Sequence, residues 1–423
     1  MKYVHMNKYF LSKIKENRTV LTNFSYLTLL QIFTLLGPLI TYPYLVRTIG
    51  LQLYGIVIFA QVLVSYISLI VDFGFNSIGA KEIASNRDNP NVISEIVSSV
   101  QLNKLIIWII CFIIYLIIVC FVPFFKDYKF VYISSFFITF NELLFPVWFF
   151  QGIEKMKYTT YINIFVKLMF ILLIFIAVKD ESDYIYIPLL NSLGALVAGL
   201  FSFYVIINKE KIRLCWIPLS KLIYYFKESV SLFISVLSVR LYLNINKLVV
   251  GSCLGMSEVA IYDLGEKIAT TMKIPIGMIG QATFPKISRE RDIRYINRLM
   301  YIVVGLAILG YMVLFLFTPF IVKLFTGDNS VDAITIVRIL GLSGIFAAGN
   351  YFLGGNRLIP LGHKNEYMKV MILNCLFYFF LLLILYIVDF LNLYSISAVT
   401  VTVEIFNTLS LIRWNRRLNI LHN

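Results

Sequence analysis

Charged residues are scarce in this sequence of 423 residues: they make up only 14% of it, while 59% is hydrophobic. Soluble domains carry roughly 25% charged residues and about 45–50% apolar ones. A soluble fold of this length could not bury such an excess, whereas lipid can surround it. The scarcity of charge therefore excludes an ordinary soluble protein and predicts an all-helical integral membrane protein.

Histidine and cysteine are also rare, with three and five residues respectively. The histidines lie in predicted tails or loops, and no cysteine pair has the spacing of a zinc site or a disulfide framework. The sequence has no phosphate-cradling glycine-rich loop, no nucleophile motif and no loop large enough for a soluble catalytic domain. We therefore predict a protein that is not an enzyme and has no metal and no cofactor. Coupling to a proton or sodium gradient stays open.

Apolar blocks of about 20 residues, long enough to cross ~30 Å of hydrocarbon, fill most of the chain. A basic N-terminal stretch precedes the first block without a cleavage site, which predicts a retained first helix. Prolines at 38, 146 and 275 lie within the blocks, where they are expected to favour bends. About twelve transmembrane helices are predicted, at residues 22–46, 53–75, 96–122, 130–151, 158–178, 184–207, 228–251, 257–284, 299–325, 332–354, 366–388 and 393–413.

Lysine and arginine divide unevenly among the connections between these helices. With both termini and the even-numbered loops inside the cell, 25 of the 37 lie inside, 5 lie outside and 7 fall within helices. Short loops rich in these residues stay on the cytoplasmic side. The sequence therefore predicts cytoplasmic N- and C-termini. The net charge of +14 then belongs to the cytoplasmic face beside anionic membrane lipids, and it does not call for a nucleic-acid partner.

The longest connection, residues 208–227, is a predicted cytoplasmic linker. It separates two predicted six-helix bundles, residues 1–207 and 228–423. A short similarity supports the division, because Gly50–Ile56 resembles Gly255–Ile261 at an offset of 205 residues. Six is an even number, so both halves would enter the membrane from the same side, as in transporters built from parallel repeats. Chance similarity between two glycine-containing turns is the alternative explanation.

Seven basic and six acidic residues fall inside the predicted helices. Each charge at the centre of a lipid-facing helix costs roughly 2.5–3.5 kcal/mol on insertion scales. The deep charges are therefore expected to face one another or a water-filled cavity between the halves. The predicted substrate-binding residues are Arg240, Lys273, Lys267, Lys167, Asn244 and Lys247. The predicted candidates for ion coupling are Glu142, Asp72, Glu404 and Asp263.

Other interpretations of these charges remain open at this point. Asp263 and Lys267 stand four residues apart and can form a structural pair on one helix. Glu95 and Lys104 lie toward the predicted cytoplasmic end of the third helix, where a long side chain can extend its charge into water. The remaining acids can likewise be partners of the bases rather than ion sites.

Several short motifs resemble those of bacterial polysaccharide flippases and occur in the same order. One of them, Phe145–Tyr158, is especially similar to the O-antigen flippases. The last three predicted helices carry no such motif. The other motifs are Pro43–Gly55, Asp72–Asn76 with Ala80–Ala84, Tyr262–Ile268 and Phe284–Arg289. The resemblance implies a fold like that of the multidrug and toxic-compound antiporters (MATE), with two six-helix bundles around a central cavity.

The resemblance also implies a function. Members of this family move an undecaprenyl-pyrophosphate-linked oligosaccharide from the inner to the outer leaflet of the bacterial cytoplasmic (inner) membrane. Pyrophosphate is a dense anion, and guanidinium and ammonium groups are suited to bind it. The implied partners are the lipid-linked oligosaccharide and membrane lipids, and a polysaccharide polymerase and glycosyltransferases are further candidates.

Two rival functions stay open. The first is a drug or cation antiporter of the same superfamily, whose cavity should be dominated by acids and aromatic residues. Bases in the helices are at least as numerous as acids here, seven against six, which weakly disfavours it. The second is a membrane enzyme such as a polysaccharide polymerase, which usually needs a large external loop.

Overall fold

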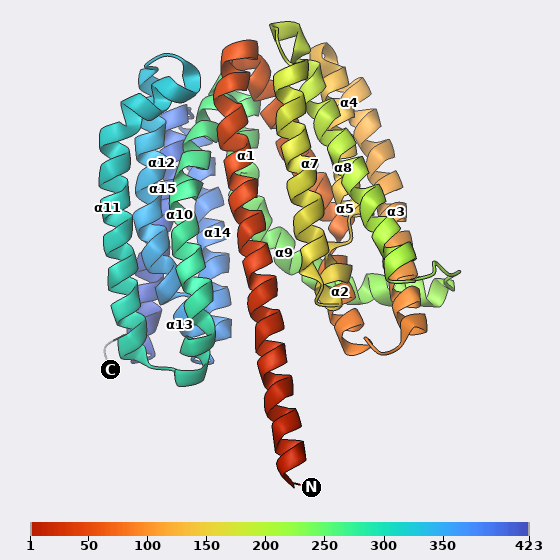
Figure 1. Ribbon diagram of the computed structural model, residues 1–423. Coiled ribbons are helices and arrows are strands. Elements are labelled where there is room, and N and C mark those ends of the chain that lie inside the picture. The colour runs from red at the N-terminus through yellow and green to blue at the C-terminus, as the bar shows by residue number, and fades with distance from the viewer. Residues whose placement is uncertain (1, 422–423) are drawn as a thin grey trace. The chain divides into compact units, whose positions relative to one another are not determined.

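The computed structural model describes residues 2–421, without the side chains of residues 2–24, 27, 35, 235, 238–244 and 285. All regular elements within this range are helical (Figure 1). The α-helices are α1 (Lys2–Asp72), α2 (Phe75–Ser85), α3 (Pro90–Phe121), α4 (Lys129–Phe136), α5 (Phe140–Leu144), α6 (Val147–Gly152), α7 (Met156–Ala177), α8 (Tyr186–Tyr204), α9 (Leu219–Cys253), α10 (Met256–Glu290), α11 (Ile293–Thr326), α12 (Val331–Leu353), α13 (Gly355–Leu358), α14 (Lys364–Ile387) and α15 (Leu393–Arg417). Short 3-10 and π-helical turns are η1 (Pro123–Tyr128), η2 (Phe137–Thr139), η3 (Glu181–Ile185) and η4 (Val205–Lys209).

The prediction of an all-helical membrane protein is confirmed. Nine helical stretches among the described residues are long and apolar enough to cross a membrane. One of them, residues 28–85, holds the first two predicted helices. Helices α9 and α10 are not among the nine, and α10 carries more of the predicted intramembrane charges than any other helix. All twelve predicted segments lie largely within helical residues, but the fourth, 130–151, is divided into α4, η2, α5 and α6.

Helix α1 is two helices joined at Gly50, which agrees with the first two predicted segments. Gly50 has φ 77° and ψ 165°, a backbone conformation outside the helical region. Glycine adopts positive φ at little cost because it has no Cβ atom. Gly50 therefore forms the break between the two helices, and it is the one described residue of α1 with non-helical backbone angles.

Pro146 also marks a break, as the sequence predicts. Helix α5 ends at Leu144 and α6 begins at Val147, with Pro146 between them. Proline removes a backbone donor and disfavours helical geometry in the residue before it. Pro38 and Pro275, by contrast, lie inside α1 and α10, which continue beyond them.

The described chain divides into two compact units. Unit 1 comprises Met1–Tyr42 and Ala60–Leu237, and unit 2 comprises Pro43–Phe59 and Ser238–Asn423. These bounds differ from the predicted bundles, because residues 43–59 belong to unit 2 and α9 continues as one helix through residue 237. The predicted division into 1–207, 208–227 and 228–423 remains a prediction about the transmembrane bundles.

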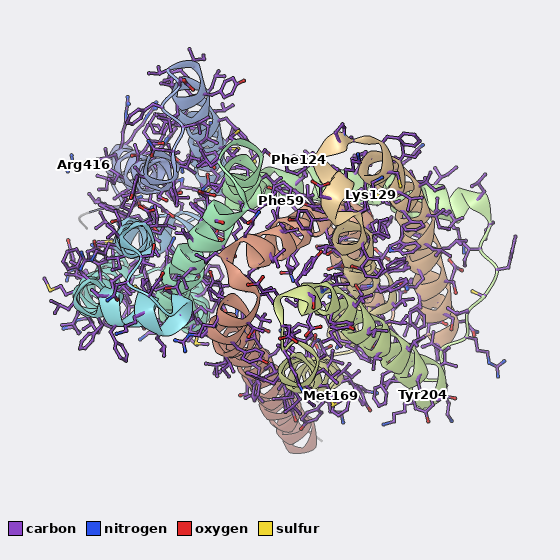
Figure 2. The ribbon with its side chains drawn as sticks, turned by 90° about the horizontal axis from the view of Figure 1, so that it is seen from above. Phe59, Phe124, Lys129, Met169, Tyr204 and Arg416 are labelled. Carbon is purple, nitrogen blue, oxygen red and sulfur yellow. The ribbon has the colours of Figure 1, made fainter. Side chains whose placement is uncertain are left out.

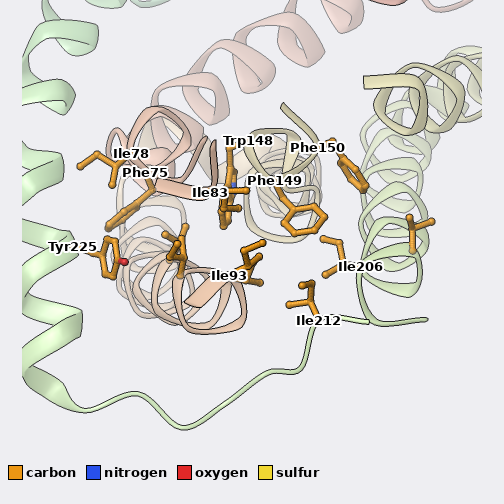
Figure 3. Packing of buried hydrophobic residues seen from close by; sticks show 14 of the residues in the cluster. Phe75, Ile78, Ile83, Ile93, Trp148, Phe149, Phe150, Ile206, Ile212 and Tyr225 are labelled. Atoms are coloured by element: carbon orange, nitrogen blue, oxygen red, sulfur yellow. The ribbon is translucent and has the colours of Figure 1, made fainter. Parts of the chain in front are cut away.

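Within unit 1, α8 packs against α4, α5 and α7, and α2 packs against α6 (Figure 1). An apolar core gathers where α2, α3 and α6 meet, and Figure 3 shows its side chains pointing toward one another. Trp148, Phe149 and Phe150 are all buried in this core. Exposed apolar side chains such as Phe124, Met169 and Tyr204 cover the outside of the helices (Figure 2). Such a surface is suited to lipid rather than water.

Within unit 2, α12 is the central helix and packs against α10, α11 and α15 (Figure 1). Helix α14 packs against α15. Gly341 permits close packing of α12 on α11, since a Cβ atom there would lie 2.6 Å from the Leu314 side chain. The arrangement places α9, α10, α12, α14 and α15 around a polar interior.

Candidate functional site

Helices α9 and α10 bring four charged side chains of unit 2 together. The Lys247 ammonium lies 2.8 Å from Asp263 Oδ1 and 2.5 Å from Glu266 Oε2. Lys267, one helical turn beyond Asp263, forms an ion pair with the other oxygen of the same carboxylate. Asp263 therefore bridges two lysines, and its side chain is only 2% exposed. We call these four residues the α9–α10 charge cluster, and its formal charges cancel.

The second half of α1 completes this cluster. The Tyr54 hydroxyl is buried and accepts a hydrogen bond of 3.4 Å from the Lys267 ammonium. Gly55 allows the approach, because a Cβ atom there would lie 1.7 Å from the Met256 carbonyl oxygen at the start of α10. The Tyr54–Lys267 hydrogen bond joins the Pro43–Gly55 motif to the Tyr262–Ile268 motif.

A cavity of about 460 Å³ lies beside this cluster within unit 2. Helix α10 contributes Lys273, whose ammonium lies 3.8 Å from Glu404 Oε1 on α15. Glu404 also accepts a 2.7 Å hydrogen bond from the amide of Asn350. The lining residues are Asn246, Tyr262, Glu266, Ala269, Thr270, Lys273, Leu340, Ser343, Met371, Asn374, Tyr378, Thr400, Val403, Glu404 and Asn407.

Neutral polar side chains form a network on one wall of the cavity. The Asn246 amide donates to the Tyr262 hydroxyl at 2.6 Å and to the Thr400 hydroxyl at 3.1 Å. The Tyr378 hydroxyl donates to the carbonyl oxygen of the same amide. Buried polar groups that satisfy one another in this way hold their side chains in a single arrangement.

Two asparagines of the cavity lack such partners. Both amide atoms of Asn374 and the amide oxygen of Asn407 are buried without a hydrogen-bond partner among the described residues. Leaving one buried polar group unsatisfied costs about 1–3 kcal/mol. The cavity therefore holds unused hydrogen-bonding capacity beside a satisfied network.

Unit 1 contains a second charge cluster, which we call the Lys104 cluster. The Lys104 side chain is fully buried, and its ammonium lies 3.5 Å from Asp72 Oδ1 and 3.9 Å from Glu142 Oε2. It also donates to the amide oxygen of Asn76 at 2.9 Å. Asn76 in turn donates its amide to Glu142. The interpretation that Lys104 extends into water is therefore wrong, because two acids from other helices hold the ammonium inside unit 1.

The same lysine stabilises the break between α5 and α6. Its ammonium donates to the Glu142 carbonyl oxygen at 3.2 Å, and Gln101 donates to the Leu143 carbonyl oxygen at 2.6 Å. Carbonyls at an interrupted helix lose their helical partners and need replacements in a medium without water. Helix α3 supplies both replacements from residues one turn apart.

The structure distributes the predicted site residues over these features. Lys247, Lys267 and Asp263 lie in the α9–α10 charge cluster, Lys273 and Glu404 lie at the cavity, and Asp72 and Glu142 lie in the Lys104 cluster. Lys167 in unit 1 contacts the Thr34 hydroxyl. The side chains of Arg240 and Asn244 lie outside the described residues. The proposed pair of Asp263 and Lys267 is confirmed, and the substrate and coupling roles remain predictions.

Sequence reasoning that followed charge missed the neutral part of the cavity. Asn246, Tyr262, Asn374, Tyr378 and Asn407 all stand in apolar blocks of the sequence. Amides within a membrane helix are costly unless they face a partner or a cavity. Asparagines also occur in α3, α7, α8 and α12, so counting them would not by itself have located the cavity.

The fold is that of a class of membrane transporters. The structure resembles an inward-facing multidrug resistance MATE family transporter of the MOP superfamily, with a TM-score of 0.70 and 16% identity over 91% of this chain and 94% of that chain. It resembles the lipid II flippase MurJ in an inward closed conformation equally well, with a TM-score of 0.70 and 12% identity over 93% and 89% of the two chains. At sequence identities this low, the structural resemblance demonstrates a shared fold alone.

The chain belongs to the polysaccharide biosynthesis protein family, whose model matches residues 20–291. A curated relative from Escherichia coli K12, provisionally named an O-antigen transporter, is 26% identical over 83% of this chain and 86% of its own. A relative from Shigella dysenteriae with the same provisional name is 26% identical over 81% and 86%. The resemblance to polysaccharide flippases that the motifs indicate is thereby confirmed.

Proposed function

We propose that this protein moves an undecaprenyl-pyrophosphate-linked oligosaccharide, an O-antigen or related repeat unit, across the cytoplasmic membrane. The cargo passes from the cytoplasmic to the periplasmic leaflet by alternating access. The observation that carries the proposal is the family membership together with relatives, named for O-antigen transport, that align over more than four fifths of the chain. Polar groups buried in otherwise apolar helices support it, because the sugar headgroup needs a polar path.

The pyrophosphate is proposed to bind Arg240, Lys273, Lys267 and Lys167, with Asn244 and Lys247 nearby. The contacts in the structure rank the described candidates. Lys247 and Lys267 already contact carboxylates at ion-pair distance, so they would have to exchange partners to bind cargo. Lys273 has one acid at 3.8 Å, and Lys167 contacts a hydroxyl. These last two ammonium groups are the more readily available for an anion.

Energy for transport is proposed to come from a proton or sodium gradient. Glu142, Asp72, Glu404 and Asp263 are the acids that could carry the coupling ion. Three of them lie within 4 Å of a lysine ammonium, as ion pairs with Lys104 or Lys273, and Asp263 contacts two lysines. Protonating any of them would weaken an ion pair with a lysine, which links an ion to a change of contacts.

The decisive test follows lipid-linked oligosaccharide in a strain that lacks this protein and keeps its glycosyltransferases. We expect the material to accumulate and to stay inaccessible to an added lectin in spheroplasts, while surface polysaccharide is lost. If the oligosaccharide reaches the outer face as in the parent strain, the flippase proposal is wrong. Increased drug susceptibility of that strain would then favour a drug or cation antiporter.

The binding model has its own test. The variants Arg240→Ala and Lys273→Ala, produced at the normal level, are each expected to reduce export at least tenfold, a loss that corresponds to about 1.4 kcal/mol of cargo stabilisation. Export that stays unchanged in both variants would refute the assignment of the pyrophosphate to these residues.

Both termini are proposed to lie in the cytoplasm. Cys215 in the predicted cytoplasmic linker and Cys253 at the end of α9 are both exposed and should lie on opposite sides. In variants that retain a single cysteine, a membrane-impermeant maleimide is expected to label Cys253 in intact spheroplasts. Cys215 should be labelled only after the membrane is opened. The reverse pattern would invert the proposed orientation.

A further inference from the structure

The cavity of unit 2 is larger than an ion needs, and eight of its fifteen lining residues are neutral and polar. Its volume of about 460 Å³ lies in the range of roughly 300–1,000 Å³ that is usual for small-molecule sites. Thr270 on its wall is exposed and Lys273 is partly exposed, so the cavity reaches the surface of the unit along α10. A small molecule could therefore enter it.

The charges around the cavity leave little attraction for a bare cation or anion. Glu266 is bound by Lys247 at 2.5 Å, and Glu404 faces Lys273 and accepts from Asn350. An inner-sphere cation would have to compete with an ammonium group for each carboxylate. An anion would meet two carboxylates for the one lysine that lines the cavity, so the pyrophosphate proposed to bind Lys273 would need Glu404 to release that ammonium first.

The unused groups in the cavity are amides. Asn374 on α14 is 7% exposed, and neither its NH₂ group nor its carbonyl oxygen has a partner. Asn407 on α15 has a carbonyl oxygen without a partner. An amide offers two donors and an acceptor in fixed geometry. Two neighbouring hydroxyl groups on a ring, each both donor and acceptor, match that set.

We propose that this cavity binds one uncharged sugar residue of the carried oligosaccharide. Asn374 donates to one ring hydroxyl and accepts from the next, and Asn407 accepts from a third hydroxyl or an acetamido N–H. The fixed network of Asn246, Tyr262 and Tyr378 forms the wall against which the ring rests. The identity of the cargo rests on the proposed function, but the recognition of a neutral saccharide by this cavity does not.

Direct binding tests the inference. The full-length protein in lipid nanodiscs is mixed with the oligosaccharide that mild acid releases from the host strain's lipid-linked pool, and binding is followed by saturation-transfer NMR. Wild-type protein is expected to bind, and Asn374→Leu should weaken binding about tenfold. Asn407→Leu, with its separate contact, should also weaken it. Each variant's unfolding temperature is measured to confirm that it is folded.

Ser397→Ala is the matched control. Ser397 lies on α15 outside the lining of the cavity, and its hydroxyl already donates to the Leu393 carbonyl oxygen at 2.8 Å. Its removal should leave saccharide binding within twofold of wild type. If wild-type protein gives no transfer signal, or if both folded asparagine variants bind as wild type does, the saccharide site is refuted.

The outcome is separable from that of the flippase test. A deletion strain that exports normally while the purified protein binds saccharide through Asn374 would refute the proposed function and leave the site in place. A deletion strain that fails to export would support the proposed function. If the Asn374→Leu variant then binds saccharide and exports normally, the assignment of the saccharide site to Asn374 is refuted.

Discussion

The two units solve the problem of buried charge in different ways. In unit 1 a single lysine, Lys104, faces two acids and also binds backbone carbonyl groups of a broken helix. In unit 2 two lysines and two acids alternate, and Asp263 bridges both bases. The first cluster depends on one cation, whereas the second shares its contacts among four residues.

This difference predicts where each unit is vulnerable. A buried charge that loses its only partner carries its full desolvation cost, while a charge with a second partner keeps part of its compensation. Unit 1 should therefore be damaged most by loss of its lysine. Unit 2 should be damaged most by loss of the bridging acid and only modestly by loss of Glu266.

The largest effect is expected for Lys104→Met. The substitution leaves Asp72 and Glu142 without their cation and the Glu142 carbonyl without its donor, so unfolding should become easier by about 3 kcal/mol or more. Thermal unfolding of the purified protein in detergent measures it. Adding Asp72→Asn and Glu142→Gln to the same variant should restore much of the loss. If the single variant unfolds at the wild-type temperature, the Lys104 cluster does not stabilise unit 1.

An intermediate effect is expected for Asp263→Asn. Lys267 then loses its acid while Lys247 keeps Glu266, so the loss should be about 2 kcal/mol. Glu266→Gln serves as the matched variant, and its loss should be closer to ~1 kcal/mol because Lys247 keeps Asp263. Equal losses in the two variants, measured by the same unfolding assay, would contradict the bridging role of Asp263.

The smallest effect on stability is expected for Lys273→Met. Its ion pair with Glu404 is long, and the two side chains are 31% and 25% exposed, so the loss should stay within about 1 kcal/mol. Export should nevertheless fall strongly, because this ammonium is proposed to bind pyrophosphate. A large loss of stability without a specific loss of export would make Lys273 a structural residue like Lys104.

Much of this fold could be predicted from sequence, because membrane helices are recognisable by their length and hydropathy. All twelve predicted segments lie largely within helices, and the breaks at Gly50 and Pro146 follow from the backbone preferences of those residues. The four-residue spacing of Asp263 and Lys267 was sufficient to suggest their pair. These are local features, in which a residue's effect depends on its neighbours along the chain.

Tertiary partners were harder to predict. Position near a helix end suggested that Lys104 reaches water, but its acids come from α1 and α5, which the sequence of α3 cannot reveal. The cavity likewise depends on asparagines and tyrosines from four separate helices. The composition of the compact units was also not evident, because a short segment of α1, residues 43–59, packs with a distant part of the chain.

The order of residues around Lys104 bears on how the protein is made. Ribosomes synthesise the chain from its N-terminus. Asp72 and Asn76 are therefore already synthesised when α3 leaves the ribosome, whereas Glu142 is not. Helix α3 has the highest hydropathy of the candidate spans, which permits it to enter lipid although it contains Lys104. The lysine can therefore meet its first acid during insertion, and it is already in place to receive the carbonyl groups of the broken helix that follows.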